Sequence, residues 1–213
     1  MTSGKPTGWY LPEVAHPYDV FTKAGYDITF VSPNGGKAPM DPGSYEAFKE
    51  DPSSKAFLKD HLKDLDNTLS PSQVSAKNYD AIVYAGGHGP MFDLPNNDAI
   101  AKLCAEMYEA GRVVGAVCHG TVGLLNVKLS NGEYMINGKE ITSFTNSEEE
   151  AVKLMADMPF PLETKLIENG ANFRGVENFK ENVVSKDKRI VTGQNPASAT
   201  GMATEIVKLL SSK

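Results

Sequence analysis

The sequence predicts an α/β protein with a mostly parallel sheet. Short runs of β-branched and apolar residues at 81–85, 112–117 and 189–193 have the composition of strands that are buried on both faces. Between the first two runs, the apolar residues at positions 100, 103, 104 and 107 share one face of a helix. A strand, a helix and a second strand at this spacing indicate a βαβ unit, in which the two strands are parallel.

The other elements follow from local patterns. Residues 26–32 are rich in strand formers and end at a Pro-Asn-Gly-Gly turn, and apolar residues between 202 and 210 predict a last helix. Residues 128–144 contain two Asn-Gly turns and are interpreted as a small antiparallel β-hairpin excursion. Residues 41–76 are polar and read as an insertion or cap region, with a solvated helix around 54–65.

Composition limits the function classes. Of 213 residues, 40% are hydrophobic and 23% charged, which fits one folded domain spanning residues 1–213. The net charge of −6 and the lack of basic blocks argue against nucleic acid or an anionic membrane as partner. No apolar run approaches the roughly 18 residues that span a bilayer. Two cysteines favour a reducing compartment, so we expect a cytoplasmic protein, with the nucleus also allowed.

Cys118 is the candidate nucleophile. It follows the apolar run that ends at Val117 and precedes a helix-like stretch, so it is expected on a sharp turn at the carboxyl edge of the sheet. The small residues Ala116 and Gly120 suit such a crowded turn. A helix N-terminus pointing at the sulfur would lower the cysteine pKa and favour the thiolate. The alternative is a buried, inert cysteine, which is the interpretation for Cys104 on the apolar helix face.

Gly86, Gly87 and His88 come directly after the strand at 81–85. Glycines there let backbone amides approach a ligand, so these residues are expected to form an oxyanion and substrate-binding site beside the thiolate. The alternative is a plain structural turn. His88 is interpreted as a wall residue rather than a metal ligand, because the four histidines show no metal-ligand spacing. No metal is expected.

Several motifs together resemble the DJ/PfpI superfamily, whose members are relatives of class I glutamine amidotransferases. The resemblance is narrower still to its heat-shock-associated subfamily of glutathione-independent glyoxalases, also called glyoxalase III or D-lactate dehydratases. It covers about residue 4 to residue 210 and implies a flavodoxin-like three-layer sandwich with a nucleophile elbow. The motifs that carry it are Gly86–Gly89, Ala116–Gly120, Lys5–Pro17, Asp41–Ser44, Met158–Glu163 and Thr192–Ser198.

The resemblance also implies the site residues. The nucleophile of the family falls on Cys118 and its histidine on His119. The acid that orients this histidine falls within Glu148–Glu150 and aligns best with Glu149, with an uncertainty of one position. Glu13 matches a second acid, which sits against the cysteine sulfur. Burial and a neighbouring thiolate would push its carboxyl towards the protonated form.

The activity that the resemblance implies is conversion of methylglyoxal, a small 2-oxoaldehyde, into D-lactate. The reaction belongs to the carbon–oxygen lyases and needs no cofactor. Two alternatives from other classes remain open: a stress-induced holdase chaperone, and a cysteine peptidase or amidase. A homodimer is compatible with each of them.

One departure from the family pattern concerns the first strand. In the family an apolar strand precedes the Lys-Pro-Thr-Gly-Trp motif and runs near the middle of the sheet, whereas only Met1–Ser3 precede Gly4 here. The first strand is therefore expected to be missing. Its neighbours would keep unpaired backbone groups, which are costly when buried. A truncated isoform or exchange within a dimer would explain the gap.

Overall fold

The protein is described by a computed structural model over residues 1–212. Its main sheet has the strand order β1–β2–β6–β5, in which β1, β2 and β6 are parallel and β5 is antiparallel. The predicted α/β class with a mostly parallel sheet is confirmed. The strands are β1 (Ala81–Tyr84), β2 (Val113–Val117), β3 (Glu140–Ile141), β4 (Asn172–Phe173), β5 (Val183–Val184) and β6 (Ile190–Gly193).

Eight α-helices and six short 3₁₀ helices accompany the strands in the described residues. The α-helices are α1 (Leu11–Lys23), α2 (Pro42–Phe48), α3 (Pro52–Asp60), α4 (Pro90–Asp93), α5 (Asp98–Glu109), α6 (Asn146–Ala151), α7 (Leu162–Glu168) and α8 (Ala199–Ser211). The 3₁₀ helices are η1 (Leu62–Asp66), η2 (Pro71–Gln73), η3 (Ala76–Asn78), η4 (Cys118–Leu124), η5 (Met155–Asp157) and η6 (Pro196–Ser198).

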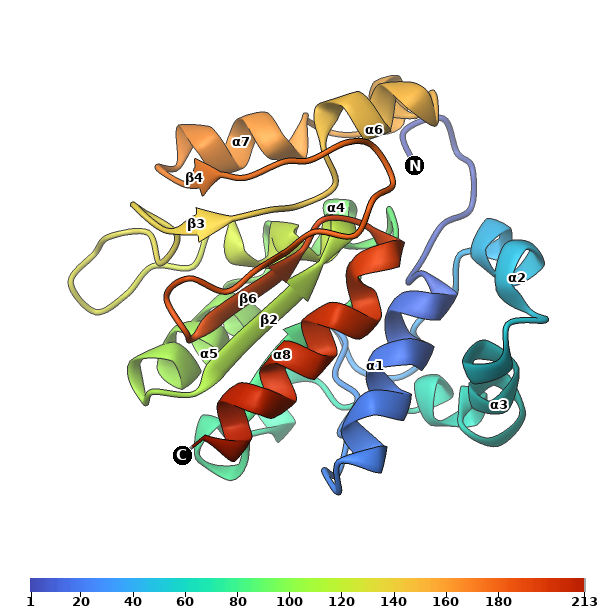
Figure 1. The fold of residues 1–213 in the computed structure, drawn as a ribbon, viewed down its shortest axis with the longest axis horizontal. Coiled ribbons are helices and arrows are strands. Elements are labelled where there is room, and N and C mark those ends of the chain that lie inside the picture. The colour runs from blue at the N-terminus through green and yellow to red at the C-terminus, as the bar shows by residue number, and fades with distance from the viewer. Residues whose placement is uncertain (213) are drawn as a thin grey trace.

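Strand β2 lies at the centre of the three layers. Its side chains alternate between the two faces of the sheet. Val113 and Val117 pack in the cluster formed with α8, while Val114 and Ala116 pack in the cluster formed with α5. Figure 1 shows α1 and α8 side by side over one face of the sheet. All five residues of β2 are buried, as the continuous apolar run predicts.

The helix predicted between β1 and β2 is α5. Asn97 caps it, because its side chain accepts a hydrogen bond from the Ile100 amide at 2.9 Å. Gly111 follows its end with φ of 77°, a left-handed conformation that favours glycine. Cys104 is fully buried on the apolar face of this helix, as expected.

Residues 41–76 form a cap beside α1. They contain α2, α3 and η1, and the helix expected around 54–65 is α3 followed by η1. Asp41 and Asp51 cap α2 and α3 by accepting from the amides of Ser44 and Ser54. The cap is not wholly solvated, since Phe57 is only 2% exposed in a cluster with residues of α1.

The hairpin expected over 128–144 is only partly present. Lys128 and Tyr134 form an antiparallel bridge around the first Asn-Gly turn. The second Asn-Gly turn makes no hairpin, because the Gly138 amide donates to the Gly170 carbonyl at 2.8 Å. Strand β3 therefore pairs in parallel with β4, and the prediction of antiparallel pairing there is wrong. The turn docks on a distant segment that local sequence does not reveal.

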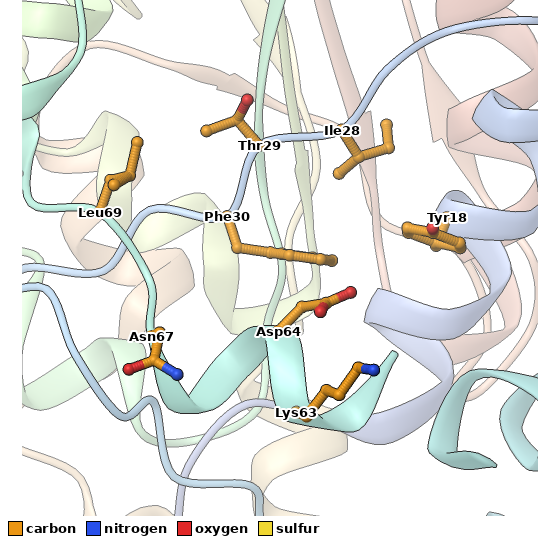
Figure 2. A pocket seen from close by; sticks show the side chains of 8 residues that line it. All are labelled: Tyr18, Ile28, Thr29, Phe30, Lys63, Asp64, Asn67 and Leu69. Atoms are coloured by element: carbon orange, nitrogen blue, oxygen red, sulfur yellow. The ribbon is translucent and has the colours of Figure 1, made fainter. Parts of the chain in front are cut away.

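The strand expected at 26–32 is not formed either. Val31 alone pairs, in an isolated bridge with Leu69. Ile28 and Val83 of β1 pack against the same hydrophobic cluster, yet no hydrogen bond joins their segments. Beside residues 28–30 the surface forms a depression of about 500 Å³ (Figure 2), lined by Tyr18, Ile28, Thr29, Phe30, Lys63, Asp64, Asn67 and Leu69.

One edge of β1 is open. Among the described residues, no strand pairs with the edge of β1 opposite β2. The residues of β1 at positions 81–83 are only half-buried, although those of β2 are buried throughout. A strand former without a partner strand cannot satisfy its backbone groups in a sheet, so composition alone does not make 26–32 a strand.

No helix in residues 1–212 is long and apolar enough to cross a bilayer.

The open edge of β1 leads to a prediction for amide exchange. The Asp80 carbonyl accepts from the Val113 amide, so by alternation the amides of Ala81 and Val83 point away from β2. We expect these two amides to exchange with deuterium at least roughly 10-fold faster than those of Val114 and Ala116, which have partner strands on both sides. Exchange followed by NMR measures this. Equal protection in both strands would contradict an open edge.

Candidate active site

Cys118 sits at the point where β2 ends and η4 begins. Its backbone has φ of 56°, a left-handed conformation that costs a non-glycine residue about 1–3 kcal/mol. The turn is also crowded: a Cβ at Gly120 would lie 2.5 Å from the carbonyl oxygen of Tyr84. This is the geometry expected of a nucleophile elbow, with the cysteine at the carboxyl edge of the sheet.

Three side chains form a hydrogen-bonded chain from the sulfur. Cys118 Sγ lies 3.3 Å from Nδ1 of His119. Nε2 of His119 lies 2.5 Å from Oε2 of Glu149, which is at the start of α6. His119 is 1% exposed, and its ring packs on that of Phe144 with 4.6 Å between centroids. The structure thus brings together Cys118, His119 and Glu149.

The electrostatics of this chain favour a neutral histidine beside a carboxylate. Burial lowers the pKa of His119 to about 4, against the opposing effect of Glu149. The pKa of Glu149 falls to about 2, because its hydrogen bonds to His119 and His88 outweigh the cost of burial. An ionised carboxylate only accepts hydrogen bonds, so Nε2 of His119 must carry the hydrogen. Its Nδ1 is then a free acceptor facing the thiol.

Glu13 lies on another side of the sulfur. It belongs to the first turn of α1 and is 1% exposed. Its carboxyl oxygens lie near the Cys118 thiol and the Gly86 amide but make no hydrogen bond of ordinary geometry there. Burial therefore dominates and raises the pKa of Glu13 to about 8. At neutral pH this carboxyl holds a proton beside the sulfur.

The expectation of a lowered cysteine pKa does not hold. Burial raises the pKa of Cys118 above its usual range, and the nearby Glu13 adds to the rise. The amides of His119 and Gly87 act in the opposite direction, as a helix N-terminus would, but more weakly. The resting sulfur is therefore a thiol. It needs a proton acceptor, and Nδ1 of His119 is the one in reach.

The glycine turn packs closely under the N-terminal segment. Gly87 has φ of 93°, and a Cβ there would collide with the Gly8 carbonyl. A Cβ at Gly86 would collide with the Glu13 carboxyl. The Gly87 amide faces the sulfur. His88 points elsewhere: its Nε2 lies 2.8 Å from Oε1 of Glu149.

The three consecutive glutamates have different surroundings. Glu148 is fully buried and accepts hydrogen bonds from Thr145, Phe179 and Asn195, so it holds the local chain together. Glu149 alone reaches His119. Glu150 is exposed. Of the three, only Glu150 is solvated, so the expected alignment at Glu149 agrees with the contact to His119.

His88, His119 and Glu149 also have the composition of a metal site. Each offers one ligand atom, and these atoms lie within 4.8 Å of one another. Two imidazoles and a carboxylate are ligands that suit zinc. The three groups already satisfy one another through hydrogen bonds, and a cation would have to displace those hydrogens. The sequence does not predict that these three side chains meet, because Glu149 lies 61 positions from His88 in the chain.

The chain matches one family model and is similar to curated proteins over nearly its whole length. The family model described as "DJ-1/PfpI family" matches residues 8–209. The chain is 35% identical to the glutathione-independent glyoxalase hsp3102 of Schizosaccharomyces pombe, over 97% of this chain and 90% of that protein. It is 32% identical to glyoxalase 3 of Candida albicans, over 97% of this chain and 91% of that protein.

Two solved structures are similar to this chain in both fold and sequence. Rapid Encystment Protein 24 kDa of Francisella tularensis matches with a TM-score of 0.90 and 42% identity, covering 96% of this chain and 90% of its own. The crystal structure of glyoxalase III from Candida albicans matches with a TM-score of 0.89 and 31% identity, covering 98% of this chain and 90% of its own.

The buried carboxyl of Glu13 predicts a pH-dependent stability. Its pKa is about 8 when folded, against 4.5 as the ordinary value, so protonation favours the folded state. That contribution is complete below about pH 4.5 and is lost as the pH rises towards 8. We expect Glu13→Gln to abolish it. Urea unfolding at about pH 5 and pH 8.5 should show wild type losing at least about 1 kcal/mol relative to the variant. A constant difference would mean that Glu13 is not buried as a neutral acid.

Proposed function

The chain belongs to the DJ-1/PfpI family, and we propose that it is a glutathione-independent glyoxalase that converts methylglyoxal into D-lactate, a D-lactate dehydratase in the carbon–oxygen lyase class. Cys118, His119, Glu13 and Glu149 are the proposed catalytic residues. The amides at Gly87 and His119 are the proposed oxyanion donors. No cofactor takes part in the proposed reaction.

The observation that carries the proposal is that the Cys118 thiol has a proton acceptor on one side and a proton donor on the other. On one side His119 is neutral and presents an acceptor 3.3 Å from the sulfur. On the other side Glu13 is a protonated acid at neutral pH. An aldose–ketose type proton shift needs a base and an acid in place together. Relatives named glutathione-independent glyoxalases support the substrate class.

The first step is addition to the aldehyde. Nδ1 of His119 takes the thiol proton, and the sulfur of Cys118 bonds to C1 of methylglyoxal as the C1–O π bond breaks. The alkoxide forms where the amides of Gly87 and His119 face the sulfur, so these amides can stabilise its charge. His119 then returns the proton to the alkoxide. The product is a hemithioacetal on Cys118.

The second step moves hydrogen from C1 to C2. His119 removes the C1 proton while Glu13 protonates the C2 oxygen, which gives an enediol. His119 then delivers its proton to C2, and Glu13 takes the proton of the C1 oxygen back. The outcome is a lactoyl thioester, with His119 again neutral and Glu13 again protonated. Glu13 can play this part because its raised pKa keeps a proton on it at neutral pH.

Hydrolysis completes the cycle. His119 assists water in attacking the thioester, and the carbon–sulfur bond breaks to release lactate and the thiol. The sum is methylglyoxal plus water giving lactate, so no electrons enter or leave. In each step Glu149 accepts from Nε2 of His119 and stabilises the imidazolium that forms.

The role of Cys118 is tested by measuring D-lactate formed from methylglyoxal without glutathione. We expect Cys118→Ala to lose nearly all activity and Cys118→Ser to lose most of it, because a serine hydroxyl is far harder to deprotonate. Cys104→Ala is the matched control, since this buried thiol lies outside the site, and it should keep wild-type turnover. Full activity in Cys118→Ser would sink the proposal. Suppression of aggregation that survives Cys118→Ala would instead favour a holdase.

The three glutamates give a matched set of variants. Glu149→Gln should slow turnover at least about 100-fold, because the amide cannot stabilise a protonated His119 as a carboxylate does. Glu148→Gln should mainly lower stability, by about 1–3 kcal/mol, because an NH₂ group would face a hydrogen-bond donor. The exposed Glu150→Gln should be silent in both assays. Turnover and thermal unfolding measured together would separate these outcomes, and equal turnover in all three would exclude Glu149.

A further inference from the structure

His88 is a second imidazole on the carboxylate of Glu149. Its Nε2 lies 2.8 Å from Oε1, while Nε2 of His119 lies 2.5 Å from Oε2. The side chain of His88 is 13% exposed and that of Glu149 is 7% exposed, so water competes little for these contacts. The two imidazole rings pack with 4.2 Å between centroids. The proposed mechanism gives His88 no step.

The hydrogens in this trio have one consistent arrangement. Glu149 is ionised and accepts at both oxygens, so each histidine donates from Nε2. A neutral His119 with hydrogen on Nε2 has its lone pair on Nδ1, which faces Cys118. If the Glu149 carboxylate rotated away, the hydrogen of His119 could move to Nδ1 and the thiol would lose its acceptor. Oε1 is the atom that must be held to prevent such rotation.

We propose that His88 is a positioning residue for His119: by binding Oε1 of Glu149 it holds the carboxylate in place and fixes the tautomer in which Nδ1 of His119 accepts the thiol proton. The effect of this on turnover rests on the proposed function. Its effect on Cys118 does not, because proton transfer from the thiol to His119 precedes any substrate chemistry.

Several charged groups act on His119 in addition to this hydrogen-bonded contact. Glu149 and the buried Glu148 both favour its protonation, whereas His88 disfavours it. Burial has the largest effect, and with His88 it keeps the pKa of His119 at about 4. The other titratable groups beside this pair are Cys118, which faces Nδ1, and Glu13, beyond the sulfur.

Two amide substitutions test the contact. The amide of Gln can occupy the place of the histidine Nε2, whereas the amide of Asn reaches only as far as Nδ1. We therefore expect His88→Gln to keep the hydrogen bond to Oε1 and His88→Asn to lose it. His88→Leu removes the donor altogether. His61→Gln is the control, because His61 makes a comparable contact with Asp64 in the cap region.

Two readouts do not depend on the proposed substrate. Long-range ¹H–¹⁵N spectra of the four histidines report the tautomer of His119, and the rate of Cys118 alkylation by iodoacetamide against pH reports proton transfer from the thiol. In wild type, His88→Gln and His61→Gln we expect hydrogen on Nε2 and equal alkylation. In His88→Asn and His88→Leu we expect mixed tautomers and alkylation slowed roughly 10-fold near neutral pH, with D-lactate formation slowed roughly 10- to 100-fold where wild type is active.

The results distinguish a failure of the proposed role of His88 from a failure of the proposed function. An unchanged His119 tautomer and unchanged alkylation in folded His88→Asn would overturn the positioning role, and His88→Leu serves the same purpose if the Asn variant does not fold. Absence of D-lactate formation by wild type would overturn the proposed function instead. In that case the spectra and the alkylation rates would still decide the role of His88.

Discussion

The site depends on the burial of the Glu13 carboxyl against the Cys118 sulfur. Two acidic groups are held together where little of either side chain is exposed to solvent. Charging either one there is costly, so burial raises the pKa of both groups. The pair therefore rests with its protons on. A protonated acid and a protonated thiol are the forms with which a carbonyl addition begins.

The burial of Glu13 against Cys118 depends on α1, on β1 and on β2. Helix α1 places Glu13 in its first turn. The turn after β1 contains Gly86, which leaves no side chain between the acid and the sulfur, and the strained elbow of Cys118 follows β2. A side chain at Gly86 would occupy the space of the carboxyl. Three separate segments thus converge on one carboxyl and one sulfur.

Local sequence predicts the elbow but not its partners. Cys118 follows a buried strand, and the spacing of its small neighbours is readable without a structure. The roles of Glu13 and Glu149 came only through resemblance to a family, because both residues reach the sulfur or its histidine across long stretches of chain. His88 lies in a motif whose glycines predict a ligand-binding turn, and its contact with Glu149 depends on how α6 packs. The prediction of a lowered pKa for Cys118 was wrong because it considered only the helix N-terminus, which is visible in the sequence. Burial, which raises the pKa, is a property of the assembled fold. The stretch at 26–32 shows the limit for secondary structure, since strand formers make a strand only beside another strand.

The open edge and the site meet in β1. This strand has a partner on one side only, and Gly86, Gly87 and His88 follow it after one intervening residue. A local opening of β1 would displace the glycine that fits against Glu13, the Gly87 amide that faces the sulfur, and the imidazole that holds Glu149. Edge strands open at lower free energy than central ones. The glycine turn and His88 therefore follow a strand that is held less firmly than the central strands β2 and β6.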